Sequence, residues 1–376
     1  MPLINIGLLG FGTVGQAIAQ LNQPFGDDRY DVVRALVRNP KTPRMVSLPL
    51  TVDPSEIIDD PSIDVVVEVA GGREPARQWI LRALSNGKAV VTANKELLAY
   101  HGSDLIQASY DAKTFLGYEA SVGGGIPLLD AIRWHLSAAP IQRLFGVLNG
   151  TTNHLLCAMA EGQTLSQALE AAQSAGFAEA DPRADIEGQD TVRKLVILIY
   201  LAFGRWVNPD NISVKGVGAW PATILNRLAQ AKLAVRLVAM ARRLTNGEIE
   251  AEVRPVVVTR ATPLYHLQGS QNGVGLSSAA GRFWLEGPGA GGLATATSIW
   301  ADIRKSRLVT RLPDPPVKPD RAAVNPWVLP FVDISLDPDR TLSRTESGPV
   351  FSDPSIVYSS PDRTLPDGVI RFPYWE

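Results

Sequence analysis

The sequence predicts an α/β fold with a parallel sheet covered by helices, followed by an α+β region and a proline-rich C-terminal arm. Over about the first 135 residues, short apolar runs alternate with helical patterns, which is typical of a parallel sheet. Beyond residue 136, strand-like and helical runs mix without this alternation. The last 71 residues contain 12 of the 28 prolines and few periodic runs, which favours an extended arm.

Composition excludes several classes of function. With 36 basic and 38 acidic side chains the net charge is −2, which does not suggest a nucleic-acid or membrane partner. The single cysteine, Cys157, cannot form an internal disulfide, and four scattered histidines give no transition-metal pattern. No apolar run approaches the ~20 residues that span a bilayer, and the N-terminus opens on a strand pattern without a targeting signal. We expect a cytoplasmic protein.

The first element is a strand within Leu3–Gly10 that leads into the glycine motif Gly10-Phe-Gly-Thr-Val-Gly15 and a helical pattern over Gln16–Leu21. Glycines permit the tight turn, and the following helix N-terminus faces a pyrophosphate, so this context predicts a Rossmann dinucleotide-binding domain. The alternative is a glycine turn without a ligand.

A second strand over Asp31–Val37 ends in Arg38-Asn39, with Lys41 and Arg44 close behind. An acidic residue at this position would bind the ribose 2′-hydroxyl of NAD, whereas a basic one accommodates the 2′-phosphate of NADP. The pattern therefore favours NADP, although solvated loop charges would look the same.

The alternation continues with a strand over Asp64–Ala70, a helix over Glu74–Ser85 and a strand over Ala89–Thr92, after which Ala93–Glu96 opens another helix. Ligands bind at the carboxyl ends of strands in such sheets. We therefore expect the following residues to line the cofactor cleft: Gly71, Gly72, Thr92, Asn94 and Lys95. Lys95 could equally be an ordinary charge at a helix start.

Next come a strand over Phe115–Ala120, the glycine-rich segment Ser121–Pro127 and a helix over Leu128–Leu136. Three consecutive glycines let backbone groups crowd around a small partner. That partner could be an anion, a monovalent cation beside Glu119, or another chain segment.

The second region is predicted to be a sheet covered by helices. We expect strands over Ile141–Leu148, Ile212–Val217, Val253–Thr259 and Phe283–Glu286, and helices over His154–Glu161, Ser166–Ala175 and Ala222–Leu244. Thr152 and Asn153 are candidate N-caps. A second glycine turn over residues 287–292 leads into a helix over Ala294–Ile303.

The stretch Gly176–Lys194 is rich in carboxylates and runs into the apolar segment Leu195–Ala202. A helix that starts near Gly188 places Asp190 and Lys194 one turn apart on one face. Such a helix carries the pair into poorly solvated surroundings, which suits a lysine that transfers protons. The alternative is an ordinary surface ion pair.

Six motifs, taken together and in order, resemble those of homoserine dehydrogenase over about residues 3–305. They are Gly10–Gly15, Val91–Lys95, Glu119–Pro127, Asn149–Asn153, Gly176–Lys194 and Gly287–Ala296. The resemblance implies an enzyme of threonine and methionine biosynthesis that interconverts L-homoserine and L-aspartate 4-semialdehyde with NADP or NAD, as a homodimer.

The resemblance also implies roles for individual residues. Lys194 would be the proton donor and acceptor, with Lys95 beside it. Asp190 would bind the substrate amino group, which we favour over a role confined to the pair with Lys194. Glu179, Asp185 and Thr152 would bind substrate. The implied cofactor contacts are Gly10, Phe11, Gly12, Thr13, Val14, Gly15, Arg38, Gly176, Glu179 and Gly291, and a sodium ion would be held by Glu119 and by main-chain oxygens of Val122, Gly124 and Ile126.

We expect a Rossmann domain over residues 1–135, rejoined by 290–305, a catalytic and dimerisation domain over 136–289, and an extension over 306–376. Many bacterial members of the family continue into a threonine-sensing ACT domain, whose alternating strands this tail lacks. Two alternatives remain: a dehydrogenase of a related small amino-acid or semialdehyde substrate, and a non-catalytic dinucleotide sensor. Retention of both lysines and Asp190 speaks against the sensor.

Overall fold

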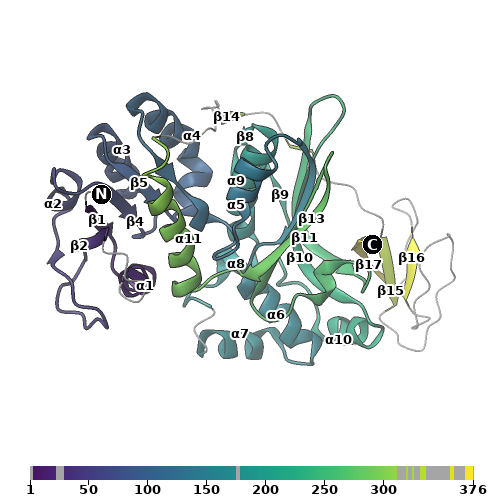
Figure 1. Ribbon diagram of the computed structural model, residues 1–376. Helices are drawn as coiled ribbons and strands as arrows, with labels where there is room; N and C mark the ends of the chain where they lie inside the picture. Colours follow the sequence, from purple (N-terminus) through teal and green to yellow (C-terminus); the bar gives the residue numbers. More distant parts are fainter. Residues whose placement is uncertain are drawn as a thin grey trace.

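The computed structural model describes residues 3–22, 29–174 and 178–310, together with 319–320, 324–325, 331–335, 356–359 and 369–375. Two sheets organise the chain, one near the N-terminus and one on the opposite side of the molecule (Figure 1). Among the described residues, no helix is both long enough and apolar enough to cross a membrane.

The first sheet is parallel and has six strands in the order β3-β2-β1-β4-β5-β6, which confirms the Rossmann-type fold. Its strands are β1 (Ile4–Leu9), β2 (Tyr30–Leu36), β3 (Leu50–Thr51), β4 (Val65–Glu68), β5 (Ala89–Thr92) and β6 (Leu116–Gly117). The helices between them are α1 (Thr13–Asn22), α2 (Ser55–Ile58), α3 (Ala76–Ser85) and α4 (Lys95–Ala112). All four residues of β4 are buried, because helices cover both faces of a parallel sheet.

A late helix returns to this sheet. Helix α11 (Gly292–Lys305) packs against α1, and the indole of Trp300 donates a hydrogen bond to the carbonyl of Ile18 at 2.9 Å. In Figure 1 this green helix lies among the purple and blue elements of the first 130 residues.

The second sheet has nine strands in the order β13-β12-β7-β10-β11-β17-β15-β16, with β9 also paired to β11. Its strands before residue 310 are β7 (Ile141–Val147), β9 (Ser213–Val214), β10 (Ala234–Arg243), β11 (Ile249–Val258), β12 (Gln271–Ser278) and β13 (Gly281–Pro288). The helices of this region are α6 (Gly150–Ala160), α7 (Leu165–Ser174), α8 (Arg183–Ile186), α9 (Gln189–Phe203) and α10 (Ala222–Gln230).

The predicted helix over Ala222–Leu244 is wrong in its second half. Helix α10 ends at Gln230, Lys232 takes a left-handed backbone with φ 61°, and β10 then pairs with β11 over ten consecutive residues. Residues Val235–Ala241 are all buried, so both faces of β10 are covered and no alternation marks the strand. Strand β12, which pairs with β7 and β13, was not predicted.

Several other boundaries differ from the predictions, and three of them lie near the sites described below. Strand β6 stops at Gly117, and Glu119–Ser121 form a 3₁₀ turn, η1. The helix expected over Leu128–Leu136 is a short α-helix, α5 (Leu128–Asp130), that continues as a π-helical turn, η2 (Ala131–His135). Helix α6 is capped by Asn149, whose side chain accepts from the backbone N–H of Thr152, and not by Thr152 or Asn153.

The C-terminal arm contains more regular structure than expected. Its strands are β14 (Pro319–Asp320), β15 (Phe331–Ser335), β16 (Ile356–Ser359) and β17 (Val369–Trp375). Strands β15, β16 and β17 pair antiparallel, and the end of β17 lies parallel to Val257–Val258 of β11. Strand β14 pairs with β8 (Trp206–Val207). Without β17, the backbone donors and acceptors of Val257–Val258 would lie at an open sheet edge, and the arm extends the sheet by pairing there.

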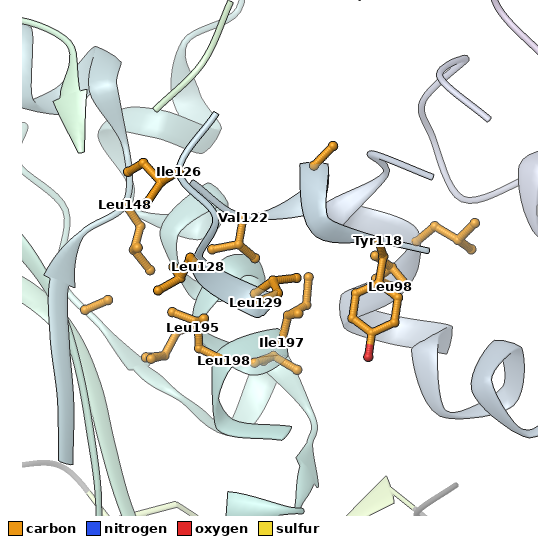
Figure 2. Packing of buried hydrophobic residues seen from close by; sticks show 14 of the residues in the cluster. Leu98, Tyr118, Val122, Ile126, Leu128, Leu129, Leu148, Leu195, Ile197 and Leu198 are labelled. Atoms are coloured by element: carbon orange, nitrogen blue, oxygen red, sulfur yellow. The ribbon is translucent and has the colours of Figure 1, made fainter. Parts of the chain in front are cut away.

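Apolar packing joins the two halves around α9. Leu195, Ile197 and Leu198 of this helix lie against the segment that carries Val122, Leu128 and Leu129, and all six are buried (Figure 2). This contact fixes the first two turns of α9, which carry Asp190 and Lys194, relative to the first sheet.

Candidate active site

A cleft of about 1240 Å³ lies at the carboxyl edge of the first sheet, between that sheet and the start of α9. It is lined by the following residues that the sequence singles out: Gly10, Phe11, Gly12, Thr13, Arg38, Gly71, Gly72, Asn94, Lys95, Glu179, Asp185 and Asp190. The structure therefore brings residues of the first sheet and of the acidic stretch to one cavity.

The glycine motif fits a dinucleotide. A Cβ on Gly10 would lie 2.8 Å from the backbone of Val69, and one on Gly15 would lie 2.4 Å from the carbonyl oxygen of Gly10, so both positions require glycine. Gly12 and Gly71 have open space where a side chain would stand. Backbone amides are thus exposed at the turn before α1, where a pyrophosphate binds in folds of this type.

One end of the cleft is basic. Arg38, Thr42 and Arg44 line it, beyond the end of β2. The guanidinium of Arg44 donates to the carbonyls of Thr42 and Asn39 at 2.8 and 3.1 Å. These contacts hold one cation in place where the ribose of a bound dinucleotide would lie.

The other end holds a buried carboxylate between two ammonium groups. Asp190 lies 2.8 Å from Nζ of Lys194, as the helical spacing predicts, and 3.1 Å from Nζ of Lys95 at the start of α4. Asn149 donates to Asp190 at 2.9 Å and to Asp185 at 2.7 Å. Five side chains from four separate segments therefore form one network.

The charges in this network shift one another's pKa. Burial by itself raises the pKa of Asp190, but the ammonium groups of Lys194 and Lys95 outweigh it and hold that pKa below its ordinary value. Asp190 in turn raises the pKa of Lys95. Burial raises the pKa of Asp185. Asp190 is therefore an ionised carboxylate, and Lys95 is paired with it as a cation.

Lys194 lies behind the wall of the cleft. It does not line the cavity, its side chain is 9% exposed, and Nζ also donates to the carbonyl of Leu148 at 2.6 Å. The first turn of α9 begins after Gly188, whose φ of 84° and close contact with Val214 call for glycine.

The remaining predicted residues have other positions. Thr152 is fully buried, bonds only to Asn149 among the contacts described, and does not line the cleft. Val14, Gly15, Thr92 and Gly291 are not among the residues that line the cleft either. Gly176 falls outside the described residues.

Sequence reasoning missed three polar residues of this region. Asn149 was identified only as the first residue of the motif Asn149–Asn153, although it bridges two carboxylates. Glu96 lies 3.5 Å from Arg193 and both line the cleft, which ties α4 to α9 beside Lys95. Glu68 is the only charged residue of the apolar strand β4. A single acidic residue at the end of an apolar run was the sequence signal by which it could have been found.

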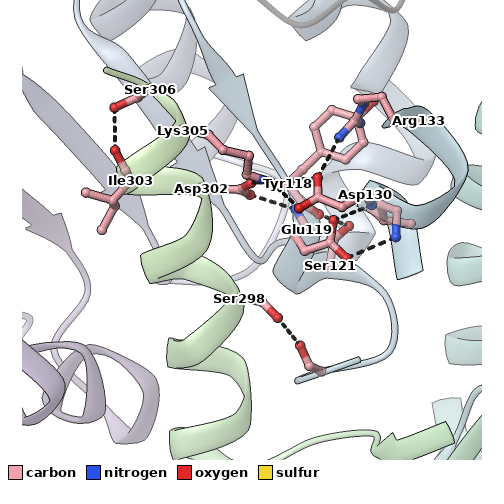
Figure 3. Close-up of polar contacts among 12 residues, drawn as sticks. Tyr118, Glu119, Ser121, Asp130, Arg133, Ser298, Asp302, Ile303, Lys305 and Ser306 are labelled. Carbon is pink, nitrogen blue, oxygen red and sulfur yellow. Dashed lines mark hydrogen bonds and ion pairs between the residues drawn. The ribbon is translucent and has the colours of Figure 1, made fainter. Parts of the chain in front are cut away.

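A second buried cluster surrounds Glu119 (Figure 3). The carboxylate of Glu119 accepts from the backbone N–H groups of Leu129 and Asp130 at 2.9 and 2.8 Å, and its own N–H donates to Asp302. Lys305 pairs with Asp130 and Asp302 at 2.6 Å. Within the described part of the chain, no group of three or more His, Cys, Asp or Glu side chains is arranged to hold a metal ion.

Two family models match the chain. The model of the homoserine dehydrogenase NAD-binding domain matches residues 10–119, and that of homoserine dehydrogenase matches residues 127–303. Among curated proteins, the homoserine dehydrogenase of Bacillus subtilis (strain 168) is 37% identical over 315 residues, which are 81% of this chain and 72% of that protein. That of Corynebacterium glutamicum is also 37% identical, over 80% of this chain and 71% of the relative.

Solved structures agree. A homoserine dehydrogenase from Thiobacillus denitrificans superimposes with a TM-score of 0.80 at 32% identity, covering 89% of this chain and 83% of the other. A hyperthermophilic archaeal homoserine dehydrogenase in complex with NADPH gives a TM-score of 0.68 at 28% identity, covering 81% of this chain and 98% of the other. The cleft is thus that of a nicotinamide dinucleotide oxidoreductase, and the chain belongs to the homoserine dehydrogenase family.

Proposed function

We propose that this protein interconverts L-homoserine and L-aspartate 4-semialdehyde with a nicotinamide dinucleotide, in threonine and methionine biosynthesis. The observation that carries the proposal is the cluster of Lys95, Asp190 and Lys194: Lys95 and Asp190 line the cleft, and Lys194 lies directly behind Asp190, 2.8 Å from its carboxylate. Such a cluster supplies proton carriers beside a site for a dinucleotide.

Oxidation of an alcohol to an aldehyde removes a hydride from carbon and a proton from oxygen. The dinucleotide supplies the hydride acceptor or donor. Lys194 takes up the hydroxyl proton in its amine form and returns it from its ammonium form in the reducing direction. Lys95, whose side chain is 39% exposed and lines the cavity, lies where it can hold the same oxygen.

The substrate carries an ammonium group that needs an anionic partner. Both oxygens of Asp190 are already engaged by the two lysines, although a carboxylate has lone pairs for further donors. Asp185 and Glu179 also line the cavity. We therefore assign the substrate ammonium to Asp185 and Glu179, with Asp190 completing the site and setting the positions of both lysines.

For the dinucleotide, the basic end supports NADP over NAD. Arg38 is exposed in the cleft, and Arg44 is oriented by two carbonyls, so both can face a 2′-phosphate.

A sodium ion near Glu119 is the second ligand that we propose. Among the described residues, Lys305 and Arg133 are the cations that face Glu119, Asp130 and Asp302, so the cluster carries one net negative charge when Glu119 is ionised. A monovalent cation would balance that charge. The carbonyls of Gly124 and Ile126 already accept one hydrogen bond each, and each keeps a second lone pair for a ligand. Val122 would supply the remaining main-chain oxygen.

We further propose a homodimer in the cytoplasm, as the family resemblance implies. The domains would comprise residues 1–135 with 290–305, 136–289 and 306–376. What supports the return of 290–305 is the packing of α11 on α1.

The test is homoserine-dependent reduction of NADP and of NAD, followed by absorbance, with Lys194→Ala alongside. We expect Lys194→Ala to lower kcat at least 100-fold, as loss of a general acid–base group does, and to leave the Kd for NADP nearly unchanged. A higher kcat/KM with NADP than with NAD would support the role of Arg38. Joint loss of turnover and dinucleotide binding in Lys194→Ala would indicate a structural role for this lysine. Binding of dinucleotide by the wild type without turnover would indicate another substrate or a sensor.

A further inference from the structure

Glu68 is a buried carboxylate that the proposed reaction does not use. It ends β4, its exposed fraction is 0%, and it lies directly before the glycine loop Ala70–Gly72 that lines the cleft. Burial raises the pKa of Glu68, while its hydrogen bonds oppose that rise. The fold keeps an ionisable side chain where an apolar one would be less costly, so its contacts require an explanation.

One oxygen of Glu68 holds the loop. Oε1 accepts from the backbone N–H groups of Ala70 at 3.0 Å and Gly71 at 3.1 Å. Gly71 and Gly72 both have a left-handed backbone, with φ of 74° and 75°, which few side chains tolerate. The two glycines can adopt many other backbone conformations, and the carboxylate therefore holds the loop in this one.

The other oxygen holds the start of α4. Oε2 accepts from the hydroxyl of Thr92 at 2.7 Å, and that hydroxyl oxygen accepts from the backbone N–H of Asn94 at 3.0 Å. The side chain of Asn94 donates to the carbonyl of Gly72 at 2.7 Å and accepts from the N–H of Leu97 at 3.0 Å, as the N-cap of α4. The first residue of α4 is Lys95, 3.1 Å from Asp190.

We propose that Glu68 is a positioning residue that sets the glycine loop against the dinucleotide and, through Thr92 and Asn94, sets Lys95 against the substrate. This proposal rests on the proposed function and adds to it a link between cofactor binding and the position of a reacting group. A carboxylate suits this role because both of its oxygens can accept hydrogen bonds, one from the loop and the other from Thr92.

The first test compares Glu68→Gln with a matched control. Glutamine has the same shape but only one acceptor oxygen, so either the loop or Thr92 loses its partner. We expect the Kd for NADP, measured by titration calorimetry, to rise about tenfold and kcat to fall about tenfold. An effect of this size is typical when a residue that orients a ligand-contacting group is replaced. Lys88→Met is the control: Lys88 is a buried charge at the opposite end of the same sheet, bonded to the carbonyls of Asp60 and Ile63. It should lower thermal stability and leave the Kd unchanged.

The second test asks whether Glu68 acts through Lys95. In a Lys95→Met background, Glu68→Gln should lower kcat no further, while the Kd for NADP still rises. An additional tenfold fall in kcat there would overturn the link to Lys95. If Glu68→Gln behaves as Lys88→Met does, with lower stability and an unchanged Kd, the proposal is wrong. If the wild type does not oxidise homoserine, the proposed function fails, and the Kd comparison still decides whether Glu68 holds the loop.

Discussion

Replacement of Asp190 by Asn tests the central cluster directly. The substitution keeps the shape of the side chain and removes the charge that two ammonium groups face at 2.8 and 3.1 Å. Removing one partner from a buried ion pair typically costs 3–5 kcal/mol of folding free energy. We expect a value near the lower end, about 3 kcal/mol, because the Lys95 side chain is 39% exposed and Lys194 keeps its bond to the carbonyl of Leu148.

The pH dependence of this cost follows from the two pKa shifts. The pKa of Asp190 is lowered, so its contribution is present above the ordinary Asp value and is lost as pH falls through the folded value. The pKa of Lys95 is raised, so its contribution is present below the ordinary Lys value and is lost as pH rises through the folded value. With ordinary values of about 3.9 and 10.4, the cost of Asp190→Asn should be constant between pH 5 and pH 9.

The assay is thermal unfolding of the two proteins across that pH range. For a chain of 376 residues, at ~2.1 cal/mol/K of unfolding entropy per residue, about 3 kcal/mol corresponds to a fall in Tm of about 4 °C. Asp185→Asn is the matched control, because Asp185 also accepts a hydrogen bond from Asn149. Burial raises the pKa of Asp185, so replacing its carboxylate should lower the free energy of unfolding little or should raise it. A cost below about 1 kcal/mol for Asp190→Asn, the value of an exposed pair, would refute a buried cluster. A cost that changes steadily from pH 5 to 9 would refute the assigned shifts.

Two further predictions concern packing and the cation site. A Cβ on Gly102 would lie 2.2 Å from the ring of the buried Trp206. Gly102→Ala should therefore lower the free energy of unfolding by about 1–2 kcal/mol, seen as a lower Tm, although alanine has a better helix propensity than glycine. An unchanged Tm would mean that the ring moves freely. Burial and the nearby carboxylates of Asp130 and Asp302 raise the pKa of Glu119 to about 8. Between pH 5 and 8 the folded state therefore binds a proton that the unfolded chain does not. The stability of the wild type relative to Glu119→Gln should fall as pH rises through this range. At pH 8, replacing K⁺ by Na⁺ should raise the Tm of the wild type and not that of Glu119→Gln; an equal rise in both would argue against sodium at Glu119.

Local patterns identified much of the chain correctly. The apolar runs that became β1, β2, β4 and β5, and the glycine turn before α1, were predictable because each depends on residues adjacent in sequence. The pair of Asp190 and Lys194 followed from helical spacing alone.

Burial on both faces hid other elements. Strand β10 has no alternation because α9 and α6 cover one face and the η4 turn (Pro263–His266) lies against the strand as well. Its alanines and arginines also favour a helix, so residue propensity predicted the wrong secondary structure. Pairing with β7 and β11 stabilises the segment as a strand instead.

The sequence by itself determined that a dinucleotide-binding sheet precedes an acidic stretch with one intrahelical Asp–Lys pair, because these features depend on local backbone geometry. Only the tertiary structure decided that Lys95 reaches Asp190 across 95 residues, that Asn149 bridges two carboxylates, and that Glu68 holds both a loop and a helix start. Such contacts join segments that are distant in the chain, and packing around α9 brings them together. The ionisable group of a side chain is fixed by its residue type, whereas its partners, and through them its pKa, are fixed by the fold.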